Sequence, residues 1–488
     1  MHTEVIYGPP GTGKTSELLQ RIKQNHDNKS PKSMCFVSFT RAAAKEMAHR
    51  AGLDDINIST IHSLAFRSLG LSRSQVMNRP EYKMFERMTG FEITGSNPEE
   101  QTTLGIGDVY LALYSLHKAL LHQDPVHTYN NSSREGSPRE FRFFVKKYEE
   151  FKRAYGKFDF TDMLTEALTS PKAEKPDFDV WYIDEAQDLS PLQWALIDFW
   201  CRGAQSVTVA GDDDQSIYVW GGADPQGMYT FEDKYKANKT ILGQSFRIPE
   251  RVHRVAEGVV ANIKNRVKKQ YRPRGQGGEV RRYDSEYSLP VPEHGQDVLF
   301  LYRNHSMREQ FESIMIENQL PYVIDSGKYG YFNSPLARAA RSLQMAVRDY
   351  QNVGRSFLKG ADKKNLVRFC VGYEQMIHAD DFSFVVKKPW YELLRGSYNM
   401  DLYENIKYLK AVQDKYGLFC QPTIHLSTIH GSKGREADRV VVLNGMGERS
   451  MENSLFDPDS ELRNFYVAVT RAKQTLDIVY GQNALTAI

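Results

Sequence analysis

The sequence predicts an α/β protein with parallel sheets flanked by helices, divided into two or more domains. A short apolar run, Val5-Ile6-Tyr7, leads into a glycine-rich loop and a helix-like stretch at residues 16–22. A second apolar run, at residues 180–183, ends in acidic residues. Such segments after strands are typical of open parallel sheets, whose ligands bind at the carboxyl ends of the strands. The 488 residues exceed the size at which one core stops growing, about 250–300 residues.

The composition disfavours several classes of protein. Sixty-three Lys and Arg residues against 61 Asp and Glu residues give a formal net charge of +2, so nucleic-acid binding requires a local basic surface. The four cysteines form no closely spaced pair, which disfavours zinc, an iron–sulfur cluster and a disulfide framework. No long uncharged apolar stretch is present, and the first motif begins too soon after Met1 for a signal peptide. We therefore expect a cytoplasmic protein that does not bind a membrane.

The first motif is the glycine-rich loop. Backbone N–H groups in such a loop surround phosphates, a lysine adds charge at the outer phosphates, and a hydroxyl ligates Mg²⁺. A chance match has a frequency of roughly a few per cent per chain, which the strand and helix patterns around the loop reduce further. The expected nucleotide-binding residues are Gly8, Pro9, Pro10, Gly11, Thr12, Gly13, Lys14 and Thr15, with Lys14 also catalytic and Thr15 also a metal ligand.

The second motif is the acidic segment Asp184-Glu185-Ala186-Gln187-Asp188. One carboxylate at such a strand end can hold Mg²⁺ through water, and another can position and deprotonate the water that attacks the terminal phosphate. We expect Asp184 to act on the metal and Glu185 to act as the base, both as catalytic residues. The alternative is a solvated acidic cluster, which the glycine-rich loop upstream disfavours. Hydrolysis, rather than nucleotide storage, is the expected chemistry.

A third apolar run, at residues 207–210, leads into Gly211-Asp212-Asp213-Asp214-Gln215-Ser216-Ile217-Tyr218-Val219-Trp220. In this order, the three segments resemble motifs I, II and III of the UvrD/Rep-like branch of superfamily 1 helicases. The segments that resemble motifs Ia, Ib, IV, V and VI of this family lie at residues 38–47, 59–66, 242–247, 425–436 and 463–473. The resemblance covers nearly the whole chain.

The resemblance implies two RecA-like P-loop NTPase lobes, with ATP between them, and two inserted subdomains that are mainly helical. The region that corresponds to the second insertion is short for the family. The expected boundaries are residues 1–66 and 155–238 for lobe 1A, 67–154 for subdomain 1B, 239–335 and 419–488 for lobe 2A, and 336–418 for subdomain 2B.

The resemblance also implies which residues surround the nucleotide. Gln215 is the expected sensor of the γ-phosphate, and Arg247 and Arg471 are catalytic guanidinium groups that reach this phosphate from the second lobe. Taken alone, an arginine is more often part of a surface ion pair. A cation supplied across a cleft, however, couples closure to hydrolysis. Phe246 stands where the family stacks a ring on adenine, and Glu436 where a carboxylate meets the ribose, so ATP and Mg²⁺ are the expected cofactors.

The same motifs imply a track for single-stranded DNA. A strand held without sequence preference needs aromatic faces for its bases and donors for its backbone. Phe39, Tyr218 and Trp220 match family positions that contact bases, although single aromatic residues are more often core. Trp220 precedes Gly221-Gly222, which predicts a flexible turn that presents the indole. The residues expected to contact the sugar–phosphate backbone are Thr40, His62, Thr428, His430 and Lys433.

A basic run lies between the motifs of the second half. A solvated helix face is the favoured interpretation of such a run, and an electrostatic contribution to DNA binding is the alternative. Its members are Lys264, Arg266, Lys268, Lys269, Arg272 and Arg274.

Together these features predict an ATP-dependent translocase on single-stranded DNA that unwinds tailed duplex DNA, with 3′→5′ polarity implied by resemblance alone. The alternative is an ATP-switched DNA-binding or protein-remodelling factor without intrinsic unwinding, which the short region at residues 336–418 favours. RNA is a further alternative substrate, because stacking and backbone contacts tolerate either sugar. The sequence identifies no protein partner.

Overall fold

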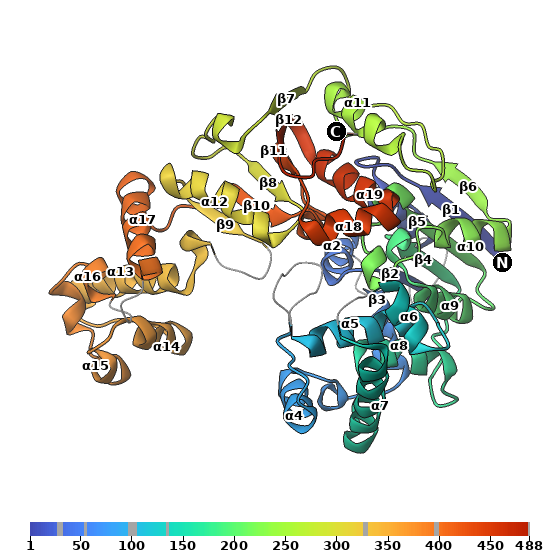
Figure 1. The fold of residues 1–488 in the computed structure, drawn as a ribbon, viewed down its shortest axis with the longest axis horizontal. Coiled ribbons are helices and arrows are strands. Elements are labelled where there is room, and N and C mark those ends of the chain that lie inside the picture. Colours follow the sequence, from blue (N-terminus) through green and yellow to red (C-terminus); the bar gives the residue numbers. More distant parts are fainter. Residues whose placement is uncertain are drawn as a thin grey trace.

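Two parallel sheets, each of six strands, form the framework of the protein (Figure 1). Helices cover the sheets, and further helices form two insertions. The predicted α/β class, with parallel sheets flanked by helices, is confirmed. The structure is a computed structural model that describes residues 1–26, 33–52, 56–95, 105–132, 136–325, 330–394 and 400–486.

The first sheet has the strand order β3-β2-β4-β5-β1-β6 and defines the first lobe. Its central strands are apolar runs buried on both faces, because helices cover both sides of the sheet. β6 pairs with β1, so this lobe extends to Ile241, past the boundary predicted at residue 238. The strands are β1 (His2–Tyr7), β2 (Met34–Ser38), β3 (Asn57–Thr60), β4 (Val180–Asp184), β5 (Ser206–Gly211) and β6 (Asn238–Ile241). The helices are α1 (Lys14–His26), α2 (Arg41–Ala51), α3 (Ile61–Ser68), α8 (Phe160–Thr169), α9 (Pro191–Trp200) and α10 (Gly227–Tyr235).

The second sheet has the order β7-β12-β11-β8-β10-β9 and defines the second lobe. One apolar cluster packs α11 and α19 against one face of it, and a second cluster fills the other face. The strands are β7 (Glu279–Tyr283), β8 (Val298–Tyr302), β9 (Tyr322–Ile324), β10 (Ile424–Thr428), β11 (Ala437–Asn444) and β12 (Ala472–Tyr480). The helices are α11 (Glu250–Val260), α12 (Arg308–Glu317), α18 (Glu448–Phe456) and α19 (Pro458–Val469).

The first insertion is helical and has an aromatic core. Phe85 packs edge-on against three aromatic rings of α7, with centroids 5.4 or 5.5 Å away. Buried Lys152 at the end of α7 pairs with Asp159 and Asp162 at 2.9 and 2.6 Å, which ties the insertion to α8 of the first lobe. The helices are α4 (Arg79–Thr89), α5 (Ile106–Ala119), α6 (Pro125–Ser132) and α7 (Pro138–Tyr155).

The second insertion extends the second lobe away from the first (Figure 1, orange). Its apolar residues are continuous with the cluster on one face of the second sheet. Among the described helices, none is both long and apolar enough to cross a membrane. The helices of this insertion are α13 (Pro335–Val353), α14 (Gly360–Phe369), α15 (Glu374–His378), α16 (Trp390–Leu393) and α17 (Met400–Tyr416).

Candidate functional site

Three sequence motifs meet at the centre of the first sheet. β4, β5 and β1 are neighbours, and they run parallel, so their carboxyl ends share one edge. The glycine-rich loop follows β1, the acidic segment follows Asp184 at the end of β4, and Asp212 follows β5. Because these strands are adjacent, residues far apart in the chain form one site.

The glycine-rich loop is held closed by its own side chains. Lys14 Nζ donates to the Gly8 carbonyl at 2.7 Å, and Thr12 Oγ1 donates to the Pro9 carbonyl at 2.7 Å. Gly11 has a φ of 72°, and a Cβ added there would lie 2.4 Å from Cβ of Arg247. A side chain is therefore excluded at this position by conformation and by space. The loop opens into the N-terminus of α1, which favours bound phosphate.

Oxygen donors suited to Mg²⁺ lie beside this loop. Thr15 Oγ1 donates to Asp184 Oδ2 at 3.0 Å, and Asp184 is 1% exposed. Burial, together with the charge of Glu185, raises the pKa of Asp184 to about 6. A divalent cation would offset the cost of holding these carboxylates together, and hydroxyl and carboxylate oxygens are ligands that Mg²⁺ prefers. Thr15 and Asp184 thus fit the metal role predicted for them.

Glu185 is held in an unusual backbone conformation. Its φ of 54° is in the left-handed region, which costs a residue other than glycine about 1 kcal/mol or more and occurs preferentially at functional sites. Gln187 Nε2 donates to Glu185 Oε2 at 2.6 Å, while Gln187 Oε1 accepts from the Asp212 backbone N–H at 3.0 Å. Burial works against ionisation, but Lys14 and Lys433 outweigh it and lower the pKa of Glu185. The carboxylate is therefore ionised and oriented, as a general base requires.

Two arginines of the second lobe reach this site. Arg471 is buried, and its Nη2 donates to Gln215 Oε1 at 2.8 Å. Burial and the charge of Arg247 lower the pKa of Arg471 to about 9, so its side chain stays charged at neutral pH. Arg247 pairs with Glu436. The structure thus brings the predicted sensor and both predicted guanidinium groups together.

The segment around Arg247 rests directly on the glycine-rich loop. The Phe246 backbone N–H donates to the Gly11 carbonyl at 2.8 Å, and Ser245 Oγ donates to the Pro10 carbonyl at 2.9 Å. Phe246 is 70% exposed, and its backbone is bonded to the loop. An exposed ring at this place can cover a flat base, as predicted for adenine.

A row of aromatic side chains lies close to Gln215. Phe39 follows β2 and stacks on Tyr218, with centroids 5.4 Å apart. Trp220 meets Tyr218 edge-on, with ring centroids 6.3 Å apart. Phe39, Tyr218 and Trp220 together form the aromatic row. The flexible turn predicted at Trp220 is wrong: Val219–Gly221 forms a 3-10 helix, and Trp220 is half-buried. The indole is therefore positioned by regular structure.

Two of the predicted backbone contacts lie below the surface. Thr428 is buried, and its Oγ1 accepts from the Gly431 backbone N–H at 3.0 Å. His430 is buried, with Nε2 3.0 Å from the Ile217 carbonyl. Burial, reinforced by Arg303, lowers the pKa of His430 to about 3, so the ring is neutral and Nε2 carries the proton. In this conformation His430 braces the lobe interface and Thr428 caps a turn within the second lobe.

Lys433 also connects the lobes. Its Nζ pairs with Asp188 and donates to the Gln215 carbonyl at 3.2 Å. The same ammonium lies 5.1 Å from the centroid of the Tyr218 ring. Lys433 thus links the acidic motif of the first lobe, the segment from Gln215 to Trp220 (called the sensor segment) and the aromatic row.

The two remaining predicted backbone contacts lie at helix starts on the first lobe. Thr40 caps α2, because its Oγ1 accepts from the Ala43 backbone N–H at 3.1 Å. His62, in the first turn of α3, meets the exposed Phe160 ring edge-on at 5.6 Å. His62 also lines a cavity of about 350 Å³, which Thr40 does not border. The other residues that line this cavity are Ser63, Phe66, Arg67, Arg73, Val76, Phe160 and Met163.

Two protein-family models match the chain. Residues 2–236 match the UvrD/REP helicase N-terminal domain, and residues 395–483 match the UvrD-like helicase C-terminal domain. The chain belongs to the UvrD/Rep-like helicase family. Its two parallel sheets are the RecA-like lobes of this superfamily 1 group.

Relatives within the UvrD/Rep-like family are distant in sequence. The ATP-dependent DNA helicase PcrA of Staphylococcus epidermidis is 24% identical over 371 residues, which cover 67% of this chain and 49% of PcrA. A Mycoplasma pneumoniae protein named "Probable DNA helicase II homolog" is 22% identical over 588 residues, covering 97% of this chain and 81% of that protein. The chain therefore spans about half the length of PcrA and most of the length of the second relative.

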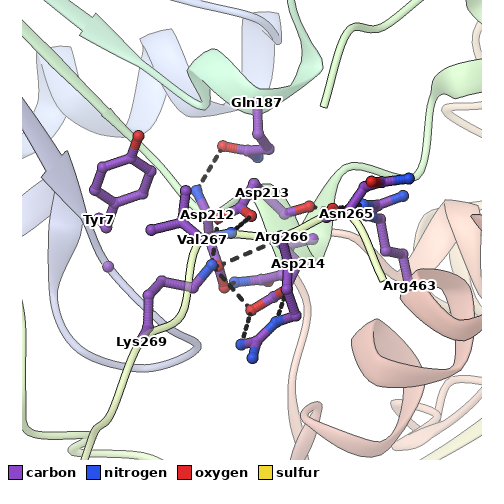
Figure 2. Close-up of polar contacts among 12 residues, drawn as sticks. Tyr7, Gln187, Asp212, Asp213, Asp214, Asn265, Arg266, Val267, Lys269 and Arg463 are labelled. Atoms are coloured by element: carbon purple, nitrogen blue, oxygen red, sulfur yellow. Dashed lines mark hydrogen bonds and ion pairs between the residues drawn. The ribbon is translucent and has the colours of Figure 1, made fainter. Parts of the chain in front are cut away.

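One part of this UvrD/Rep-like site was not indicated by the sequence patterns. The basic run at residues 264–274 forms no helix, and two of its members are not solvated: Lys269 is buried and Arg266 is half-buried, in ion pairs with the carboxylates of Asp212, Asp213 and Asp214 (Figure 2). The sequence feature that could have predicted this cluster is the three consecutive carboxylates after an apolar strand, because such carboxylates need cations as partners if they are buried.

Proposed function

We propose that the chain is an ATP- and Mg²⁺-dependent translocase on single-stranded DNA that unwinds tailed duplex DNA with 3′→5′ polarity. One observation carries the proposal: a single short segment between the lobes has contacts of two kinds. Gln215 at its start meets Arg471 of the second lobe. Tyr218 and Trp220 at its end belong to the aromatic row. The segment thus connects the group assigned to sense the terminal phosphate with the rings assigned to hold bases.

Hydrolysis is assigned to the groups at the carboxyl ends of β1, β4 and β5. Glu185 accepts the proton of the attacking water. Lys14, together with Arg247 and Arg471, stabilises negative charge on the transferring phosphoryl oxygens. Mg²⁺ held by Thr15 and Asp184 supplies further neutralisation of the phosphate oxygens when it is bound. Because the cations come from both lobes, the site is complete only when the lobes are closed.

Closure of the lobes on ATP is the proposed source of movement. ATP can favour the closed state only by the free energy of contacts that it makes in that state and not in the open one. Loss of the terminal phosphate removes a partner of Gln215 and of both arginines, so it weakens the closed state. Each cycle then changes the position of Tyr218 and Trp220 relative to the second lobe, which moves a stacked base.

The proposed substrate is single-stranded DNA of any sequence. Stacking on aromatic rings is sequence-tolerant because every base has a π-face. Hydrolysis should therefore be strongly stimulated by an oligo-dT strand, and weakly by blunt duplex DNA, in a steady-state phosphate-release assay. Equal rates with and without the strand would overturn the proposal, and stronger stimulation by oligo-U would assign RNA as the substrate.

Replacing Trp220 with Ala should weaken strand binding and uncouple hydrolysis from movement. Loss of one base–aromatic stack costs about 1–3 kcal/mol, so affinity for oligo-dT should fall about tenfold to a hundredfold. Fluorescence anisotropy measures the affinity, and the ratio of base pairs unwound to ATP hydrolysed measures coupling. Trp220→Phe should restore most of both. Tyr287, which is 74% exposed on the second lobe, provides the control variant Tyr287→Ala; wild-type unwinding by Trp220→Ala would contradict the stacking role.

A further inference from the structure

Three consecutive carboxylates are buried where β5 leads into the sensor segment. Asp212, Asp213 and Asp214 are each no more than 1% exposed. Burying one unpaired charge costs several kcal/mol, so three together require cations in direct contact. These cations come from the second half of the chain, from the segment between α11 and β7 (Figure 2).

Lys269 lies among all three carboxylates. Its Nζ is 3.0 Å from Asp212 Oδ1 and 2.9 Å from Asp214 Oδ2, and it also pairs with Asp213. Burial alone would lower the pKa of Lys269, but the three carboxylates raise it, so the ammonium is charged. The ammonium occupies the space in which a metal ion would otherwise meet these oxygens. The carboxylates are therefore an ion-pair cluster and not a metal site.

Arg266 contributes a second cation on the outer side of the cluster. Its Nε and Nη2 donate to the two oxygens of Asp214 at 2.7 and 2.5 Å. Asp214 thus has a fork-like pairing with Arg266 in addition to its contact with Lys269. Lys269, in contrast, also pairs with Asp212, which follows β5 at the edge of the sheet where Lys14 and Asp184 lie.

Asp212 connects Lys269 to Gln215 through its two carboxylate oxygens. Its Oδ1 faces Lys269, while its Oδ2 accepts from Gln215 Nε2 at 2.8 Å. With Nε2 committed to Asp212, the Gln215 carbonyl Oε1 must point the other way, where it accepts from Arg471 Nη2 at 2.8 Å. If the Gln215 amide were rotated by 180°, its NH₂ group would face the Arg471 guanidinium. That arrangement is unfavourable because both groups donate hydrogen bonds and neither can accept one. The Asp212 carboxylate, which Lys269 holds by its other oxygen, therefore faces the NH₂ end of the amide and leaves Oε1 for Arg471.

We propose that Lys269 is a positioning residue for ATP hydrolysis, which acts through Asp212 to orient the Gln215 side chain toward Arg471. The ammonium of Lys269 is taken up by three carboxylates, so its role is to position other groups. The inference rests on the proposed ATPase function, and it adds a contact from the second half of the chain that prepares the sensor before ATP binds.

The first test is Lys269→Met, which removes the charge with a side chain of similar length. At saturating oligo-dT, kcat for ATP hydrolysis should fall about tenfold to a hundredfold, because misplacing a catalytic group by about 1 Å costs that much. The KM for ATP and the affinity for a fluorescent non-hydrolysable ATP analogue should stay within about threefold of wild type, since the phosphate-binding loop is intact. Lys268→Met, at the exposed neighbouring position, is the matched control and should hydrolyse ATP at the wild-type rate.

A double-mutant cycle separates positioning from general support of the fold. If Lys269 acts through Gln215, Lys269→Met should lower kcat by less than about threefold when Gln215 is already Ala. A purely structural lysine would cost the same factor in both backgrounds. That equal cost, or an unchanged kcat in the single variant, would overturn the proposal.

A second variant keeps the proposal testable if Lys269→Met does not fold. Asp212→Asn leaves two carboxylates opposite two cations, so the cluster is electrically balanced. The ammonium of Lys269 should attract the new amide oxygen and turn its NH₂ group toward Gln215, which reverses the Gln215 amide. We expect kcat to fall by a similar tenfold to hundredfold and the melting temperature to be kept, whereas wild-type kcat in Asp212→Asn would contradict the relay.

The two levels of the proposal fail in different ways. If the wild-type protein shows no DNA-stimulated hydrolysis, the proposed function fails. If the wild type hydrolyses ATP with DNA stimulation and both variants match it, the function stands and the role of Lys269 is wrong.

Discussion

We expect replacement of Glu185 with Gln to lower kcat for DNA-stimulated ATP hydrolysis by about a thousandfold, within the range for loss of a general base. The amide is nearly the same shape as the carboxylate but cannot accept the proton of the attacking water. ATP binding should survive, because Lys14 and the backbone of the glycine-rich loop are unchanged. Single-turnover hydrolysis gives the rate, and titration with a fluorescent ATP analogue gives the affinity.

Glu309→Gln, on the exposed face of α12, is the matched control for Glu185→Gln and should behave as wild type. Turnover above about a tenth of the wild-type rate in Glu185→Gln would exclude Glu185 as the principal base. Equal losses of binding and turnover would place Glu185 in nucleotide binding instead. Both outcomes are distinguishable because the two measurements are independent.

Replacing Arg471 with Ala should have an effect of comparable size, about a thousandfold on kcat, as for arginines supplied across a cleft to a phosphoryl group. The change removes a charge from the second lobe and leaves Gln215 Oε1 without the bond it accepts at 2.8 Å. Arg471→Lys keeps the charge but lacks the planar fork that serves two acceptors, so it should recover only part of the loss.

The burial of Arg471 requires a folding control for both substitutions. Thermal unfolding and affinity for oligo-dT without nucleotide should be measured beside kcat. A folded, DNA-binding Arg471→Ala protein that keeps more than about a tenth of wild-type kcat would contradict the role given to the guanidinium. Full activity in Arg471→Lys would show that charge alone is sufficient.

The strand and loop patterns predict the nucleotide side of the site because a parallel sheet brings strand ends together. Once β1, β4 and β5 are parallel neighbours, Lys14, Asp184 and Asp212 share one edge. No comparable rule predicts contacts between the lobes. The bond between Arg471 and Gln215 joins residues 256 positions apart, and it followed only from the resemblance to a known family.

Other features depend on tertiary packing that residue type does not reveal. His430 was predicted to reach DNA, but the structure buries it at the lobe interface, where it is neutral. The basic run was interpreted by its charge alone, whereas Lys269 is buried because Asp212 and its two neighbours need a cation. Burial of a charge depends on where its partners lie in the fold, and local sequence carries little information about that.

Strand displacement on tailed duplexes tests the central claim most directly. One fluorescently labelled duplex with a 3′ single-stranded tail and one with a 5′ tail are each incubated with the wild-type protein, ATP and Mg²⁺, and Glu185→Gln serves as the inactive control. We predict ATP-dependent displacement from the 3′-tailed duplex and little from the 5′-tailed one. ATP hydrolysis without displacement on either tail would contradict a helicase and support a DNA-bound switch or remodelling factor, and displacement from the 5′ tail alone would contradict the polarity.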